Sequence, residues 1–262
     1  MPIQKLKRLF RRRASVEVSE AQGVRTLHLG GPAIQSAIRL SAPERLELAY
    51  TRAMMAFMLF APAPRDLLMV GLGGGSIARF VHEQLPRTRI TVVEINPEVV
   101  AAARSFFGVP FDDDRLEVVV GNGAAYVPTQ RAACDVLLLD AFEDGQSVRS
   151  LATLGFYEAC RNALRPDGIL VVNFIADEPR FGVYLSRIEC AFEGRLLCLP
   201  AEDRVNVIVL AFRRRIARVA IEPLKRAGRE LKRRYGLPFD RFARELAEHN
   251  PGTTGYVMLE RM

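Results

Sequence analysis

The chain has 262 residues, of which 49% are hydrophobic and 26% charged, an ordinary composition for one α/β domain with appendages. No apolar run reaches the roughly 18–20 residues of a membrane helix, so no membrane span is expected. The four cysteines are scattered without a C-x-x-C pair, which favours a reducing, cytoplasmic location and argues against a zinc site or a disulfide framework.

The net charge of +7 is concentrated at the two ends of the chain. Residues 1–13 carry +6 and residues 213–234 carry +8, so the rest of the chain carries −7. An acidic body suits a cationic substrate, whereas basic ends suit phosphates of nucleic acid. Such charge runs more often form solvated surfaces, so nucleic acid is not the favoured partner. Residues 1–14 lack the apolar stretch of a signal peptide and are interpreted as a cytoplasmic basic arm.

Residues 15–64 are expected to form a small cap and a helix that links it to the main domain. Three alternating segments joined by glycine turns predict an antiparallel β cap: Ser15–Glu20, Val24–Leu29 and Ile34–Leu40. Apolar residues then recur at helical spacing, which predicts a helix from Pro43 to about Phe60.

The stretch from Asp66 to Glu94 is the strongest motif in the chain. Asp66–Val70 is an apolar run of strand length, and Ser76–Gln84 is helical. Between them, a glycine turn allows the backbone to approach a ligand closely; its glycines are Gly71, Gly73, Gly74 and Gly75. Glu94 ends the next strand, where a carboxylate can accept from both hydroxyls of a ribose. The motif therefore predicts a nucleoside site.

From residue 65 to about 213, strands and helices alternate, which is typical of a doubly wound parallel sheet. The last two predicted strands, Arg195–Leu199 and Asn206–Phe212, are too close for a crossover helix and should pair antiparallel. A mostly parallel seven-stranded sheet that ends in an antiparallel hairpin indicates the S-adenosylmethionine-dependent methyltransferase-like Rossmann fold. Residues 214–262 are expected to add a basic helical extension broken near Gly236.

Polar residues follow two further strands at the same predicted edge of the sheet. Asn122, followed by Gly123, can accept from an adenine amino group or serve as a turn residue. Asp140 ends the apolar strand Cys134–Asp140, and the nearest predicted helix starts some ten residues later, too far for Asp140 to cap it. Acids at this edge face the ligand crevice, so Asp140 is a candidate catalytic or substrate-binding residue.

The order of these motifs from about Leu27 to Phe212 resembles the spermidine synthase family, also called polyamine aminopropyltransferases. The resemblance implies a co-substrate, decarboxylated S-adenosylmethionine, and an amine acceptor; it also implies a homodimer and no metal. It places Gln35 in the family's cap motif, the glycine turn and Glu94 at the nucleoside, and Tyr50 at the segment after the cap. It makes Asp140 the base that takes the amine's proton, and Glu143 the partner of the far amine.

Four residues depart from the family pattern. Gly74 stands where the family has an Asp that binds the aminopropyl ammonium, and Thr51 and Arg52 stand where it has His or Gln and then Glu. At the adenine site, Asn122 stands where the family has an acidic residue.

Three other interpretations stay open from the sequence. Gly74 is expected to leave room for the carboxylate of intact S-adenosylmethionine, which would make the protein a methyltransferase. The second is a non-enzymatic nucleoside-binding relative. The presence of both Glu94 and Asp140 argues against it, because such a protein needs neither residue. A nicotinamide dehydrogenase is disfavoured because Ser76 breaks the G-x-G-x-x-G spacing from Gly71.

Overall fold

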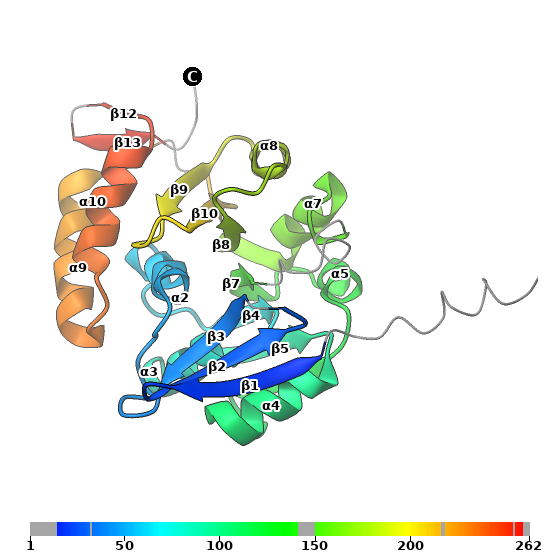
Figure 1. Cartoon of the computed structure of the whole chain (residues 1–262). Helices are drawn as coiled ribbons and strands as arrows, with labels where there is room; N and C mark the ends of the chain where they lie inside the picture. The colour runs from blue at the N-terminus through cyan, green and yellow to red at the C-terminus, as the bar shows by residue number, and fades with distance from the viewer. Residues whose placement is uncertain (1–14, 32, 141–149, 216–217, 254, 259–262) are drawn as a thin grey trace, which may run out of the picture.

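The computed structural model describes residues 15–31, 33–140, 150–215, 218–253 and 255–258. It contains a three-stranded cap, a seven-stranded central sheet flanked by helices, and a C-terminal pair of helices with a small sheet (Figure 1). In the described part of the chain, no helix has the length and apolar character needed to cross a membrane.

The cap is antiparallel, as the sequence predicts. Its strands are β1 (Val16–Ala21), β2 (Val24–Leu29) and β3 (Ile34–Arg39), paired in that order. Leu27 and Ile38 are buried against the main domain. Figure 1 shows the cap beside helix α4 (Pro97–Phe107), so that β3 reaches the region of the glycine turn.

The predicted helix from Pro43 to Phe60 is shorter than expected. Only α2 (Ala49–Met54) and the 3₁₀ helix η1 (Met55–Leu59) form. The carbonyl oxygens of the preceding segment are bound by arginine side chains: Pro43 by Arg79, and Leu46 and Glu47 by Arg52. These hydrogen bonds from arginine side chains satisfy carbonyl oxygens that would otherwise accept backbone hydrogen bonds in a helix.

The central sheet confirms the predicted fold. Its order is β6-β5-β4-β7-β8-β10-β9, with antiparallel pairing only at β8–β10 and β10–β9 among its described strands. The strands are β4 (Asp66–Val70), β5 (Arg89–Glu94), β6 (Leu116–Val120), β7 (Cys134–Leu139), β8 (Leu164–Ile175), β9 (Leu196–Pro200) and β10 (Asn206–Phe212). Apolar side chains cover both faces of the inner strands, as a sheet with helices on both sides requires.

The helices of the main domain follow the strands in alternation. Besides α4 they are α3 (Ser76–Gln84), α5 (Gly123–Tyr126) with η2 (Val127–Thr129), α7 (Leu154–Ala163) and α8 (Phe181–Ala191). Helix α7 begins at Leu154, because Thr153 caps it by accepting from the backbone N–H of Phe156.

The C-terminal helices pack on the central domain. They are α9 (Ile221–Tyr235) and α10 (Phe239–His249), which lie side by side (Figure 1). Phe239, Phe242 and Leu246 are fully buried in the same hydrophobic core as β4 and η1. A small sheet of β11 (Arg218–Ala220), β13 (Tyr256–Met258) and β12 (Gly252–Thr253) flanks them, and the sequence did not indicate it.

Candidate active site

The glycine turn between β4 and α3 requires glycine for two separate reasons. Gly71, Gly73 and Gly75 have positive φ angles of 93°, 54° and 70°, which other residues adopt at a cost. A Cβ at Gly75 would also lie 2.2 Å from the Cγ2 of Val109. The turn is therefore fixed in shape by close packing beneath it.

Glu94 is held in one orientation by the glycine turn. Its carboxylate is 7% exposed and accepts from the backbone N–H of Leu72 at 2.8 Å and from that of Asn96 at 2.8 Å. Each carboxylate oxygen can accept a further hydrogen bond. The side chain therefore links the turn to the end of β5 and retains the acceptor capacity that a ribose diol needs.

The cap closes over this turn through Gln35 and Tyr50. The Tyr50 hydroxyl lies 3.0 Å from the backbone carbonyl oxygen of Gln35 and carries one proton, which either that oxygen or the Asp140 carboxylate can accept. That same carbonyl oxygen lies 3.9 Å from where a Cβ of Gly73 would stand. Residues from the cap, α2 and the turn, predicted separately from the sequence, therefore meet.

Asp140 lies at the carboxyl end of β7, next to this assembly. Its backbone N–H donates to the carbonyl of Val70, and its Oδ1 accepts from the Nδ2 of Asn173 at 3.0 Å. Burial raises the pKa of the Asp140 carboxyl to about 6; hydrogen bonds from Asn173 and Tyr50 oppose this rise, and the charge of Glu94 adds to it. A carboxylate with such a pKa is suited to accept a proton near neutral pH.

Asn173 is a site residue that the sequence reasoning missed. It lies 9% exposed on β8, and its Oδ1 accepts from the Nδ2 of Asn206 at 2.9 Å. The sequence held a signal: Asn173 is the single polar residue in the apolar run from Ile169 to Ile175. Its partner Asn206 opens the last strand, and nothing in the linear sequence connects the two.

Asn122 and Gly123 lie at the carboxyl end of β6, where the sequence placed them. Asn122 caps the short helix α5, with its Oδ1 accepting from the backbone N–H of Ala124 at 2.9 Å. A Cβ at Gly123 would lie 2.4 Å from the Cγ1 of Val70. Both residues thus have local structural roles, and contact with an adenine ring stays a prediction. Glu143 lies outside the described residues.

Gly74 leaves no space for a side chain of its own. A Cβ at this position would lie 2.6 Å from the Oγ of Ser36 and 2.9 Å from the Cδ1 of Phe107. Any larger residue at position 74 would therefore require Ser36 and Phe107 to move, and the room for a ligand carboxylate stays a prediction.

Arg52 and Thr51 do not present free polar groups beside Tyr50. Arg52 forms an ion pair with Glu202, 2.9 Å between Nε and Oε1, in addition to its bonds with two carbonyls of the preceding segment. The Thr51 hydroxyl donates to the carbonyl of Leu48. The positive charge of Arg52 is thus balanced within the protein.

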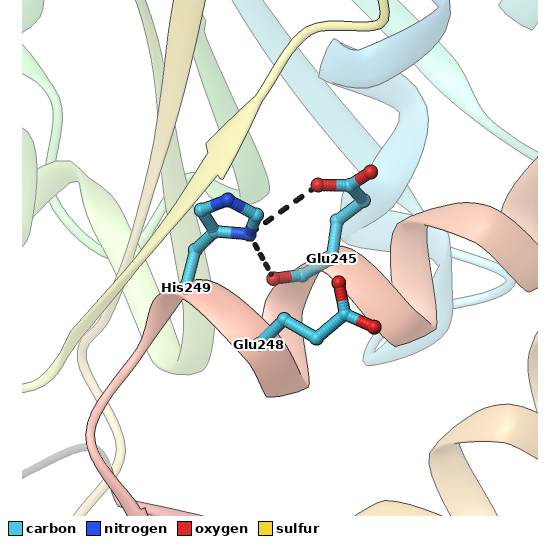
Figure 2. Close-up of side chains that lie close together, drawn as sticks. All are labelled: Glu245, Glu248 and His249. Carbon is cyan, nitrogen blue, oxygen red and sulfur yellow. Dashed lines mark hydrogen bonds and ion pairs between the residues drawn. The ribbon is translucent and has the colours of Figure 1, made fainter.

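One group of side chains on α10 has metal-ligand geometry: Glu245, Glu248 and His249 (Figure 2). Glu245, however, is paired with Arg204 at 3.1 Å and with Arg241 at 3.5 Å, and its carboxylate also contacts His249. Two guanidinium groups beside the carboxylate disfavour a bound cation, so we interpret this group as an ion-pair network.

Comparison with known proteins gives a consistent match. Residues 47–179 match the model of the spermine/spermidine synthase domain. The chain is 41% identical over 244 residues to a polyamine aminopropyltransferase from Chromobacterium violaceum, covering 93% of this chain and 94% of the relative.

Solved structures share the same fold. A probable spermidine synthase from Corynebacterium glutamicum matches with a TM-score of 0.68 and 22% identity over 93% of this chain and 95% of its own. Human methyltransferase-like protein 13 in complex with SAH matches with a TM-score of 0.66 and 25% identity, over 72% of this chain and 93% of its own. The fold alone is therefore compatible with two kinds of transfer.

Proposed function

Because the chain belongs to the spermine/spermidine synthase family, we propose that it transfers an aminopropyl group from decarboxylated S-adenosylmethionine to an amine acceptor and releases methylthioadenosine. The observation that carries this proposal is the position of Asp140. Asn173 and Tyr50 form hydrogen bonds with its carboxylate, and the negative charge of nearby Glu94 raises its pKa. A base thus lies beside the groups suited to a nucleoside.

The reaction needs a base because a protonated amine has no lone pair for attack. As the ammonium proton passes to the Asp140 carboxylate, the nitrogen lone pair forms a bond to the carbon next to the sulfonium. The bond between that carbon and sulfur breaks, and its electron pair stays on sulfur, giving the neutral thioether. Alignment of the two substrates supplies much of the remaining acceleration.

The other site residues hold the nucleoside in this proposal. Glu94 would accept from the ribose hydroxyls, and the backbone of the glycine turn would approach the ligand from below. Gln35 and Tyr50 would close the site from the cap side. Asn122 and Gly123 would border the adenine, and Glu143 would pair with the distal ammonium of the acceptor.

Methyl transfer from intact S-adenosylmethionine is the second candidate. It is favoured by the absence of an acid at Gly74, where the family has one, and by the likeness to methyltransferase-like protein 13. It is weakened by the relatives, since the chain is 41% identical over 93% of its length to a polyamine aminopropyltransferase.

Thermal shift with four ligands separates these functions: decarboxylated S-adenosylmethionine, S-adenosylmethionine, methylthioadenosine and NAD. A ligand that binds only the folded protein raises Tm by mass action. We expect the decarboxylated form and methylthioadenosine to give the largest shifts, and methylthioadenosine to accumulate with a diamine acceptor. If decarboxylated S-adenosylmethionine raises Tm no more than S-adenosylmethionine does, the aminopropyl proposal loses its basis. If neither of these two co-substrates shifts Tm, both transfer proposals fail.

We also propose a cytoplasmic homodimer. All four cysteines are thiols in the structure, as a reducing compartment maintains them. The family resemblance implies the dimer, and sedimentation at several protein concentrations measures it.

A further inference from the structure

We propose that Asn206 and Asn173 form an amide relay that positions Asp140 and sets its proton affinity. The proposal rests on the proposed role of Asp140 as the base. It assigns a function to two buried asparagines that act through another residue and so are positioning residues.

The relay runs across three neighbouring strands. Asn206 opens β10 and donates to Asn173 on β8 at 2.9 Å; Asn173 donates to Asp140, just after β7, at 3.0 Å. The sheet register brings them together, because Leu139 pairs with Val172 and Ile208 pairs with Asn173. The three polar side chains are therefore placed by backbone pairing and not by a loop.

The direction of the two hydrogen bonds follows from the chemistry of the groups. An ionised carboxylate only accepts, so Asn173 must turn its NH₂ group toward Asp140. Its carbonyl oxygen then faces the other way and needs a donor, which is the NH₂ group of Asn206. If Asn173 were reversed, its oxygen would face the Asp140 carboxylate and the two acceptors would repel. Asn206 thus stabilises the productive orientation of Asn173.

The surroundings make a purely packing role for Asn173 a poor account. Its neighbours on β8 are apolar and at most 2% exposed from Ile169 to Val172. Transfer of an amide into such an environment is costly without hydrogen bonds, and a leucine or valine would pack more favourably. The amide stands at a position of the strand from which its NH₂ group bonds to the Asp140 carboxylate.

The groups that act on Asp140 come from three other elements. Tyr50 on α2 and Asn173 on β8 bond to its carboxylate, and Glu94 on β5 contributes a negative charge. The Asn173 amide donates to this carboxylate directly, whereas Tyr50 has one proton for two acceptors, Asp140 and the Gln35 carbonyl. Loss of the Asn173 donor therefore removes a hydrogen bond that favours the ionised form. The carboxylate should therefore bind its proton more tightly without the relay.

The test is the titration of the Asp140 carboxyl by carbon NMR in protein labelled at aspartate carboxyls, with the Asp140→Asn variant assigning the signal. Asn173→Leu should raise the pKa of Asp140 by about one unit, a tenfold change in proton affinity. Asn206→Leu should shift the pKa in the same direction by a smaller amount. Leu210→Val, a buried change on β10 at a position that pairs with Val171 and not with Asn173, is the matched control and should leave the pKa unchanged.

Turnover gives an independent reading. Both leucine variants should lower kcat, Asn173→Leu by about tenfold, with methylthioadenosine affinity changed less than about twofold. An unchanged Asp140 pKa in Asn173→Leu would overturn the relay, and a wild-type titration in Asn206→Leu would remove Asn206 from it. Asn173→Val, whose side chain suits a strand, is the substitute should Asn173→Leu not fold.

These experiments distinguish a failure of the proposed function from a failure of the relay. If the wild-type protein transfers no aminopropyl group but the pKa of Asp140 moves in the variants, the proposed function is wrong and the relay stands. If transfer occurs and neither the pKa nor kcat responds, the relay is wrong and the proposed function stands.

Discussion

Ser36 of the cap packs directly against Gly74 of the glycine turn, so closely that a Cβ at position 74 would lie 2.6 Å from the Ser36 Oγ. The cap and the glycine turn are therefore in close contact at Gly74, the position where the family resemblance implies an aspartate. A side chain at position 74 would meet Ser36 of the cap and Phe107 of α4.

Substitution of Gly74 by Asp should accordingly destabilise the protein. Ser36 and Phe107 must move to admit any side chain, and overpacking of this kind costs about 1–3 kcal/mol. Urea unfolding of Gly74→Asp and Gly74→Ala measures it, and both should be less stable than wild type. Combining Gly74→Ala with Ser36→Gly should recover part of the loss, because the nearest obstructing atoms are removed.

The matched control for this prediction is Gly182→Ala. Gly182 lies in α8, and a Cβ there would meet no atom within 4 Å. This change should be neutral or stabilising by up to about 1 kcal/mol, since alanine favours helices. Equal effects at positions 74 and 182 would contradict the packing argument.

Asp140→Asn should abolish turnover while nucleoside binding survives. An amide cannot take the proton of the attacking amine, and loss of general-base catalysis lowers rates by about 10²–10⁴. Single-turnover measurement of methylthioadenosine release reports the chemical step, and titration with methylthioadenosine reports binding. An active variant would remove Asp140 as the base.

The pH dependence of kcat/KM should have an acidic limb near the pKa of Asp140, which is about 6. The base must be ionised, so activity should rise with pH through this value and then level off. Rates that stay constant from about pH 5 to 7 would indicate that no group with this pKa is essential in the free enzyme.

The same raised pKa has an opposite consequence for stability. Because the folded-state pKa of Asp140 lies above its ordinary value of 3.8, its contribution to stability is fully present below that value and is lost as pH rises through about 6. At about pH 7.5, Asp140→Asn should therefore be more stable than wild type by about 1–2 kcal/mol, after allowance for partial contact with solvent. Urea unfolding at about pH 4 should show this gain nearly gone.

The sequence was sufficient for the main domain because its signals are local. The alternation of apolar strands and helices, the glycine turn and the acids at strand ends can each be read within a few residues, and they predicted the sheet with its final hairpin. The predicted helix was wrong for residues 43–48, because the side chains of Arg52 and Arg79 bind carbonyl oxygens of this segment. Its helical spacing reflects burial, such as that of Leu46, and not a helix.

Contacts between residues far apart in the sequence also could not be predicted. Asn173 and Asn206 are 33 positions apart and meet only through the β8–β10 register. Arg52 and Glu202 are 150 positions apart, so the sequence showed an unbalanced arginine where the structure shows an ion pair. The cap could be predicted as an element, whereas its contact with Gly74 depends on how two elements dock.

We expect the Arg52–Glu202 ion pair to stabilise the fold and not to bind the acceptor. Arg52→Met removes the ion pair and the bonds to two backbone carbonyls, and we expect a loss of about 2 kcal/mol in urea unfolding. Glu202→Gln should cost less, and the double variant should show a coupling of about 0.5–1 kcal/mol, because both side chains keep partial contact with water. A large rise in KM for the amine without loss of stability would instead place Arg52 at the acceptor.

The C-terminal helices should unfold together with the central sheet. Phe242 on α10 is 1% exposed, packs edge-to-face on Phe239, and belongs to the hydrophobic core that contains β4 and η1. Phe242→Ala should therefore destabilise the whole protein by about 3–5 kcal/mol in a single transition followed by circular dichroism. Phe111→Ala is the matched control, since Phe111 is 77% exposed and contacts the Arg104 guanidinium, an interaction worth about 1 kcal/mol or less at such a site. Two separate transitions in Phe242→Ala, with the nucleoside-dependent one unmoved, would show that α9 and α10 form an independent unit.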